Sequence, residues 1–430
     1  MLNYYGLSDF AAGQGVSRGS IWVARQGLEG QYRVSGQSLI KIEYDQSVTV
    51  LGTVSGVDQA SMTYSLNNLA IVADSNLYYY NPTDGFRQIT DPHVGNPIDI
   101  VWADFRFVLT DGEFLFQSNE LNEEEYEPAD FVGSDFQPDK IWGVGLNDDN
   151  ELIAFNELTT EYFVNVGADN FSYTRIQLKA VKAGIAGTHA KAEFKDKWYA
   201  LTRRSNTQYQ FSVIQSGSSE SITSREIEKV LSKYTDDQLS KTVIEVFTKD
   251  SVVWMIAHLP NETLAYNESI AKAHGNDIAW SMLKTDVYGD RDYRGKDMVY
   301  DPRFSKWCIG DKRDNTIGFL DDSVCTHYGE IVEGLLFTPV LDMETLSINE
   351  LKLKTIPGIS PDNDATVFIS RTDDMRIYGQ KHTEKYGANF DYNKNFTMRN
   401  LGYVRSETAF RIRTASRSRM AFTQLDIDAS

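Results

Sequence analysis

Histidine and cysteine side chains, which supply many metal ligands and nucleophiles, are few and scattered in this sequence. The six histidines include no pair at the i, i+4 spacing that places two metal ligands on one helix face. They are His93, His189, His258, His274, His327 and His382. Cys308 and Cys325 are the only cysteines, too few for a disulfide framework or a four-sulfur zinc site. The sequence therefore predicts no metal and no cofactor.

Carboxylates are abundant, but their number alone marks no catalytic pair. Glycosidases place two carboxylates on either side of the scissile bond, and with 61 acidic residues many chance pairs exist. The Ser-x-Asp-x-Gly-x-x-Trp repeat of sialidase-like propellers is absent, and so are the Walker phosphate loop and the Gly-x-Gly-x-x-Gly fingerprint. We therefore expect no enzyme, and keep a propeller-type glycan-binding or glycoside-hydrolysing protein as the alternative.

The overall charge argues against a nucleic-acid-binding protein. The 430 residues have a net charge of −19, which repels phosphate backbones. No apolar run approaches the length of about 18 residues that a membrane helix needs. We expect a protein made in the cytoplasm, without stable membrane insertion and without sequence-specific binding to DNA.

The sequence indicates that any binding surface of this protein is positioned by short strands joined by polar turns. Residues 60–90 alternate short apolar runs with turns at Asn67-Asn68, Asp74-Ser75 and Asp84-Gly85, a pattern typical of an antiparallel meander. Similar blocks recur about every 40 residues up to residue 324, and such a period with four strands per unit indicates a β-propeller. We predict an all-β fold in which residues 1–325 form a propeller of six or seven degenerate blades. An irregular stack of β-sandwiches is the alternative.

A short helical segment interrupts the strand blocks near residues 224–241. Ile227, Val230, Leu231 and Tyr234 follow the i, i+3, i+4, i+7 spacing of a helix face, and Thr235 to Gln238 has a capping-box pattern. An insertion between blades is a plausible contact surface, although a helix that only stabilises the propeller rim explains the pattern equally well. The residues proposed to contact a partner here are Arg225, Glu226, Ile227, Lys233 and Tyr234.

The sequence pattern changes near residue 330, where longer irregular loops begin to separate the strands. We predict a C-terminal β-sandwich over residues 330–430. On its strand around Phe410, period-2 alternation places Arg411 and Arg413 on one face and Phe410 and Ile412 on the other. Arg411 and Arg413 are therefore candidate contacts for an acidic partner, with a solvated strand face as the alternative.

Several collinear segments resemble the packaged-DNA stabilisation proteins, also called tail hubs or tail accessory factors, of Salmonella-type lambdoid short-tailed phages. No single segment is diagnostic, but together they span nearly the whole chain in the same order. The segments are Gly15–Gly19 (GVSRG), Tyr32–Gly36 (YRVSG), Lys182–Thr188 (KAGIAGT), Ile227–Thr235 (IEKVLSKYT), His258–Pro260 (HLP), Leu283–Thr285 (LKT), Gly310–Lys312 (GDK) and Leu336–Pro339 (LFTP).

This resemblance implies a structural protein of the phage tail, assembled in the host cytoplasm. It implies a ring of six copies beneath the portal and its adaptor protein, which closes the DNA exit channel together with a tail needle and supports the tailspikes. DNA would pass through the ring during ejection. Members of the family also carry an additional segment before the stretch that corresponds to Gly6-Leu7.

Overall fold

The computed structural model describes residues 4–120, 122–134, 136–287, 289, 291–343, 345–355, 365–386, 395–417 and 420–430. Two compact units make up the chain. The larger comprises residues 10–283 and 294–317, and the smaller comprises residues 1–9, 284–293 and 318–430. The predicted domain limits of 1–325 and 330–430 stay predictions.

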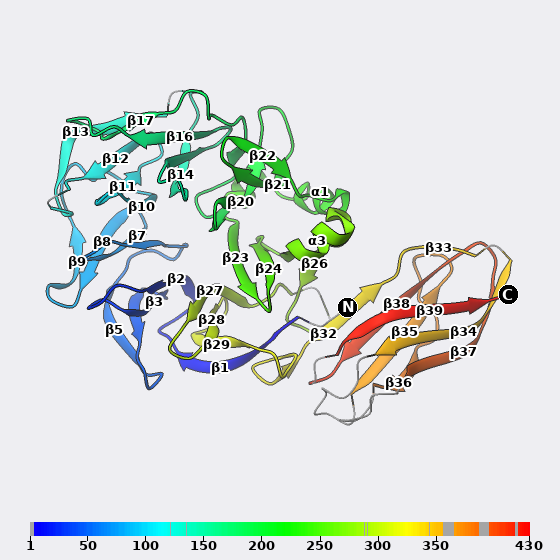
Figure 1. Cartoon of the computed structure of the whole chain (residues 1–430). Coiled ribbons are helices and arrows are strands. Elements are labelled where there is room, and N and C mark those ends of the chain that lie inside the picture. Colours follow the sequence, from blue (N-terminus) through cyan, green and yellow to red (C-terminus); the bar gives the residue numbers. More distant parts are fainter. Residues whose placement is uncertain are drawn as a thin grey trace. The chain divides into compact units, whose positions relative to one another are not determined.

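The predicted propeller is confirmed: small antiparallel sheets surround a central axis (Figure 1). We number them as blades in chain order. Blade 1 contains β2 (Ser17–Val23), β3 (Gly30–Ser35), β4 (Ser38–Ile42) and β5 (Val48–Thr53). Blade 2 contains β6 (Ser61–Tyr64), β7 (Leu69–Ala73), β8 (Asn76–Asn81) and β9 (Gly85–Ile89). Blade 3 contains β10 (Asp99–Ala103), β11 (Arg106–Thr110), β12 (Phe114–Ser118) and β13 (Tyr126–Gly133).

The second half of the propeller repeats this plan with small variations. Blade 4 contains β14 (Ile141–Leu146), β15 (Leu152–Asn156), β16 (Thr160–Asn165) and β17 (Tyr173–Arg175). Blade 5 contains β18 (Gly184–Ile185), β19 (Lys191–Phe194), β20 (Lys197–Arg203), β21 (Gln210–Gln215) and β22 (Ser218–Ser221). Blade 6 contains β23 (Val243–Lys249), β24 (Val252–His258), β25 (Thr263–Asn267) and β26 (Trp280–Leu283).

Blade 7 is the six-stranded sheet of order β27-β28-β29-β1-β30-β31. Its strands are β27 (Gly295–Asp301), β28 (Lys306–Asp311), β29 (Thr316–Asp321), β1 (Gly6–Ala12), β30 (Thr326–His327) and β31 (Glu330–Ile331). The N-terminal strand β1 is thus a member of a sheet built otherwise from residues beyond 294. It pairs with β30 in parallel, with Leu7 opposite His327.

Two-residue turns in the left-handed region connect neighbouring strands of several blades. Such turns match the twist of a hairpin, and Asp tolerates a positive φ better than most residues. Asp74 and Ser75 have φ values of 52° and 58°, and Asp250 and Ser251 have values of 55° and 63°. The turn fixes the register, so that Ala73 pairs with Asn76 directly beside it. Local turn chemistry therefore explains why each block folds into a meander.

Apolar layers fill the space between neighbouring blades. Leu69 and Ile71 of blade 2 pack with Val34 and Leu39 of blade 1, all of them fully buried. Similar clusters join blades 2 and 3, 3 and 4, 4 and 5, and 5 and 6. No blade of about 40 residues buries its own two faces, so this stacking supplies the propeller core.

The helical insertion lies between blades 5 and 6. It consists of α1 (Arg225–Leu231), capped by Ser224, and α2 (Asp236–Leu239), where Thr235 and Gln238 form the predicted capping box. A further helix, α3 (Glu268–His274), followed by the 3-10 turn η1 (Asn276–Ile278), interrupts a block expected to be all strand; the side chain of Asn267 caps α3. None of these helices is long and apolar enough to cross a membrane, and no other helix of the described residues is.

The predicted C-terminal β-sandwich is confirmed as well. One sheet has the order β32-β38-β35-β36, with β33 also paired to β38, and the other has the order β37-β34-β39. The strands are β32 (Glu333–Phe337), β33 (Leu341–Asp342), β34 (Leu346–Thr355), β35 (Thr366–Thr372), β36 (His382–Lys385), β37 (Asn395–Val404), β38 (Glu407–Ala415) and β39 (Phe422–Ala429). Their inner faces share an apolar core that includes Leu351, Val367, Ile369, Phe410 and Ile412.

Candidate functional site

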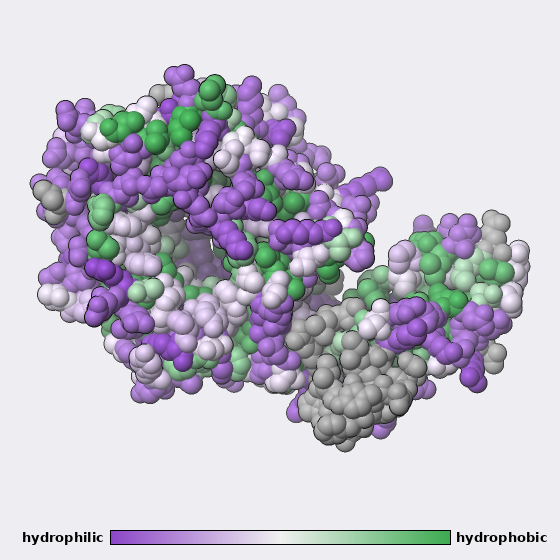
Figure 2. Space-filling model, in the orientation of Figure 1, coloured by the Kyte–Doolittle hydropathy of each residue, from purple (hydrophilic) through white to green (hydrophobic). Residues whose placement is uncertain are grey.

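A cavity of about 400 Å³ lies on the propeller axis. The inner strands β2, β6, β10, β14, β19, β23 and β27 all contribute to its wall, so every blade takes part. Figure 2 shows the propeller hollowed at this point. Its wall mixes apolar side chains such as Met62 and Val101 with the charged groups Asp99, Lys191 and Glu245.

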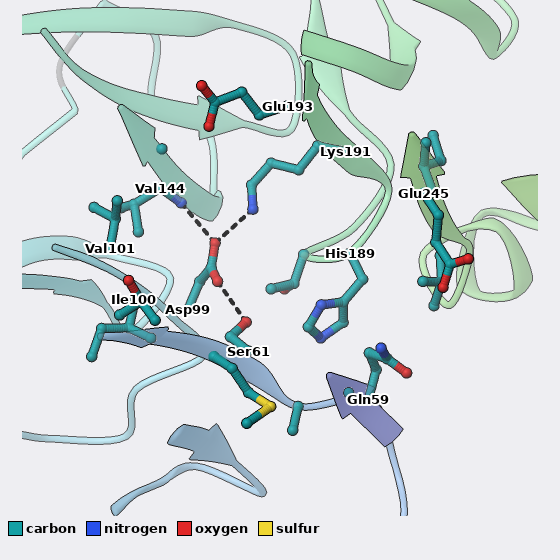
Figure 3. A pocket seen from close by; sticks show the side chains of 18 of the residues that line it. Gln59, Ser61, Asp99, Ile100, Val101, Val144, His189, Lys191, Glu193 and Glu245 are labelled. Carbon is teal, nitrogen blue, oxygen red and sulfur yellow. Dashed lines mark hydrogen bonds and ion pairs between the residues drawn. The ribbon is translucent and has the colours of Figure 1, made fainter. Parts of the chain in front are cut away.

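Asp99 is the best-connected carboxylate of the cavity (Figure 3). Its Oδ2 accepts hydrogen bonds from Lys191 Nζ at 2.8 Å and from the backbone N–H of Val144 at 2.9 Å, and its Oδ1 accepts one from Ser61 Oγ at 2.6 Å. Asp99 is 3% exposed. Strand β10 is thereby tied to β6, β14 and β19, which makes Asp99 a link between blades rather than a carboxylate poised for catalysis.

His189 lies in the same cavity, on the side of Asp99 that faces Gln59 (Figure 3). Burial lowers the pKa of His189 to about 4, although the negative charge of Asp99 opposes this shift. The imidazole is therefore neutral at physiological pH. It contributes a polar but uncharged group to the wall.

Asp297 forms a second buried polar centre, which we call the seam, where blade 7 meets blades 6 and 1 and the segment that leads into blade 2. It lies at a bulge in β27 with a φ of 58° and is 5% exposed. Its carbonyl oxygen accepts hydrogen bonds from Ser20 Oγ at 2.9 Å and from Arg33 Nη2 at 2.6 Å. Its carboxylate accepts one from Gln59 Nε2 at 2.5 Å, and its backbone N–H donates to Glu245 Oε1. One residue thus connects three blades and the segment that leads into blade 2.

The pKa values of the two carboxyl groups of the seam are shifted in opposite directions. Burial, and then the negative charge of Asp297, raise the pKa of Glu245 to about 8. Burial also opposes the charge of Asp297, but the positive charge of Lys296 and the hydrogen bond from Gln59 hold the pKa of Asp297 below its usual value. Asp297 is therefore the more acidic of the two carboxyl groups.

The letters Gly15-Val-Ser17-Arg-Gly19 match the nucleophile-elbow pattern of serine hydrolases. An elbow places its serine on a sharp turn between a strand and a helix. Ser17 instead lies on strand β2, is 7% exposed, and packs against Gly310 of β28, where an added Cβ would come within 2.3 Å of Ser17 Oγ. Ser17 therefore serves close packing between blades. Among the described residues, no group of three or more His, Cys, Asp or Glu side chains is arranged to hold a metal ion.

The helical insertion presents only part of its predicted contact set. Arg225 and Glu226 are exposed, whereas Ile227 is 6% exposed and packs into the core between blades 5 and 6. Lys233 Nζ lies 3.2 Å from Glu262 Oε1, and Tyr234 Oη donates to Glu262 Oε2 at 2.9 Å. Ile227 thus anchors α1, while the role of the exposed residues stays a prediction.

The two arginines of the sandwich have different surroundings. The guanidinium of Arg413 pairs with Glu333 and is 11% exposed, and Glu333 also pairs with Lys284 Nζ at 2.5 Å. Arg411 is half-buried, with its guanidinium carbon 4.4 Å from the ring centroid of Tyr378. The alternation predicted around Phe410 and Ile412 is present, but the side chains flanking the arginines come from segments 30 to 80 residues away and had no signal in the local sequence.

Comparison with known proteins identifies relatives of both parts of the chain. A family model described as "Bacteriophage P22 Gp10, beta-propeller" matches residues 1–325, and one described as "Bacteriophage P22 Gp10, beta-sandwich" matches residues 333–430. The tail hub protein gp10 of Salmonella phage P22 is 28% identical over 423 residues, which cover 94% of this chain and 86% of that protein.

Solved structures give more distant likenesses. The extracellular domain of a one-component system of B. thetaiotaomicron has a TM-score of 0.49 at 10% identity, over 92% of this chain and 48% of that chain, so this chain spans about half of its length. The WD40 domain of Neurospora crassa Pan2 has a TM-score of 0.44 at 7% identity, over 73% of this chain and 91% of that chain. Neither likeness carries a functional argument.

Proposed function

Because this chain belongs to the Bacteriophage P22 Gp10 family, we propose that it is a tail hub that closes the DNA exit of a short-tailed phage. In this proposal six copies assemble in a ring beneath the portal and its adaptor protein. The ring, together with a tail needle, retains the packaged genome. It also anchors the tailspikes.

The match to a tail hub over both domains is the observation that carries this proposal. The buried polar groups of the propeller support it, because the carboxylates of Asp99 and Asp297 are committed to hydrogen bonds that join blades. Side chains used in this way stabilise a scaffold. The net charge of −19 also suits a protein past which DNA moves without sticking.

The sealing role is tested with DNA-filled phage heads that lack this protein. Purified protein is added back to one sample, nuclease is added to both, and the surviving genome is measured. We expect the added protein to keep the DNA nuclease-resistant. Equal loss of DNA in both samples, with binding to the adaptor confirmed, would reject the sealing role and favour the glycan-binding alternative.

The ring is tested by counting copies on the adaptor complex with mass photometry. We expect six copies of the hub on each complex. A single copy per complex would contradict a ring.

The exposed face of α1 is our candidate contact with the adaptor or with a neighbouring hub. Charge reversal at Arg225 and Glu226 is expected to weaken tail assembly, because both side chains are exposed and Ile227 holds the helix in place. Lys233→Glu is a separate variant, since it also breaks the ion pair with Glu262. Normal assembly with all three reversed would remove this face from the interface.

A further inference from the structure

The outer face of one sandwich sheet exposes aromatic and apolar side chains beside an arginine. We call this set the aromatic face: Leu335, Phe337, Phe368, Tyr378 and Arg411. Antiparallel pairing places Phe337 opposite Arg411, and therefore on the same face. The rings of Phe337 and Tyr378 lie 5.9 Å apart, and Arg411 lies over Tyr378. Phe337 is 54% exposed, an unusual exposure for so large an apolar side chain.

The two outermost strands of blade 3, β12 and β13, expose a second aromatic group, and acidic side chains lie in or beside the same strands. We call this set the acidic edge: Glu113, Phe114, Glu125, Glu127 and Phe131. The rings of Phe114 and Phe131 meet edge to face at 5.0 Å, and Phe131 is 51% exposed. The three glutamates are exposed, and within the described residues no cation pairs with them.

Nearby cations do not neutralise the acidic edge. Arg87 and Arg106 are engaged with Glu124 and Glu120. They are also two of only three basic residues between positions 42 and 174, a stretch with 24 acidic residues. The net charge of this stretch is therefore −21, which exceeds that of the whole chain.

The sandwich as a whole is neutral, since residues 331–430 contain 13 basic and 13 acidic residues. On its aromatic face, however, Arg411 lies opposite Phe337, and Arg413, which pairs with Glu333, lies opposite Leu335. Both surfaces therefore expose aromatic rings, and the cation Arg411 of one is complementary to the three glutamates of the other.

We propose that the aromatic face of one copy docks on the acidic edge of the next copy of this chain. The contact joins two different patches, so its repetition generates a ring when the rotation closes. This proposal rests on the proposed function in one respect, because it assumes that several copies of the hub assemble with one another. Tyr and Arg are enriched among the residues that supply most of the binding energy at the centre of a contact, and opposite charges bring the patches together in the correct orientation.

Cross-linking between two separately purified variants tests this contact. One carries Leu335→Cys on the aromatic face, and the other carries Ala129→Cys on the exposed strand β13 of the acidic edge; both substitutions leave the aromatic rings in place. The two proteins are mixed and treated with a short bismaleimide. We expect a covalent dimer in the mixture, with a yield roughly tenfold above that obtained when Leu178→Cys, at a fully exposed position elsewhere, replaces Ala129→Cys.

The wild-type chain is the control for the two native cysteines, both of which are buried. Its expected yield of cross-linked product is near zero. A yield with Ala129→Cys that only equals the yield with Leu178→Cys would overturn the proposal. So would a cross-link from Leu335→Cys, in assembled tails, to a different tail protein.

A charge swap tests whether electrostatic complementarity holds the contact. Arg411→Glu in the Leu335→Cys protein is expected to lower the dimer yield roughly tenfold, and Glu127→Lys in the Ala129→Cys protein to restore part of it. Arg411→Gln replaces Arg411→Glu if the latter lowers the melting temperature. A yield unaffected by either change at Arg411 would reject the proposed pairing. Because genome protection is measured separately, a positive cross-link with a leaking genome would retain the contact and reject the hub.

Discussion

The seam of the propeller and the core of the sandwich hold their strands together by different means. The seam connects three blades and the segment leading into blade 2 through buried polar groups, with Asp297 bonded to Ser20, Arg33, Gln59 and Glu245. The sandwich core is filled by fully buried apolar side chains such as Phe410. Directional hydrogen bonds specify which blades meet, whereas an apolar core requires mainly the correct volume. The two regions should therefore respond differently to mutation and to pH.

The sequence supplies a way to observe the two regions separately. All seven tryptophans lie between Trp22 and Trp307, so tryptophan fluorescence reports the propeller. Backbone amide exchange of residues 395–415 reports the sandwich. Tryptophan fluorescence and amide exchange are both measured for each variant.

The largest effect is expected from Asp297→Ala. Removing this carboxylate leaves Gln59 without its acceptor and deprives Lys296 of a nearby negative charge, and breaking a buried charged network costs about 3–5 kcal/mol. The tryptophan transition in urea should move to lower denaturant, with amide exchange of the sandwich unchanged. Asp74→Ala, at an exposed residue with a similar φ of 52°, controls for the backbone strain of replacing Asp there. Equal losses in the two variants would mean that the seam contributes nothing beyond strain.

Ile412→Ala is the matching change in the sandwich core. Truncating a fully buried isoleucine costs about 2–5 kcal/mol through lost burial and the cavity left behind. Amide exchange of β38 should accelerate, with the tryptophan transition unchanged. The loss should also be the same at pH 6 and pH 9, because the sandwich side chains around Ile412 are apolar. A loss that varied between these two pH values would contradict the comparison.

Glu245→Gln tests the pH dependence expected of the seam. The pKa of Glu245 is about 8 in the folded chain against an ordinary value of 4.5, so the folded state binds the extra proton between these values. The stability of the propeller should consequently fall as the pH rises from about 5 to 8. Glutamine resembles the protonated form, so the variant should show a flatter profile of melting temperature, measured by tryptophan fluorescence from pH 5 to 9. An unchanged slope would show that another group titrates; Glu127→Gln, on the exposed acidic edge, is the control.

The smallest effect is expected at the end of α1. The hydroxyl of Ser224 accepts from the backbone N–H of Ile227, and replacing such an N-cap with alanine costs about 1 kcal/mol. Ser232→Ala, at the exposed C-terminal end of the same helix, should cost less than about 0.5 kcal/mol. The free energies of unfolding of the two variants, measured in urea, distinguish the loss of the capping hydrogen bond of Ser224 from the effect of replacing a serine at the other end of the helix. Similar values would show that the insertion is not stabilised by its cap.

The sequence predicts well what is determined locally. The Asp-containing turns, the period of the blades and the capping box at Thr235 all depend on residues within a few positions, and the structure contains them. Six or seven blades were expected, and the propeller contains seven sheets. Helix α3 was missed because its block reads as apolar strands on either side and Asn267 is its main local signal.

The polar centres of the molecule could not be predicted from the sequence. Asp297 meets Arg33 across 264 positions and Gln59 across 238 positions. Arg413 meets Glu333 across 80 positions. Among 61 acidic residues nothing nearby in the sequence distinguishes Asp99 or Asp297, because their partners come from other blades. Asp99 and Asp297 meet these partners only when the propeller has folded.

The place of strand β1 has a consequence for how the protein is made. Leu7 pairs with His327, so β1 waits for a partner that is synthesised 320 residues later. At bacterial rates of translation this interval lasts on the order of 20–60 s. During that time β1 is an unsatisfied strand edge, a target for chaperones and for other unfinished chains. The yield of hub should therefore depend on how well the host protects this N-terminal strand until the last part of the propeller leaves the ribosome.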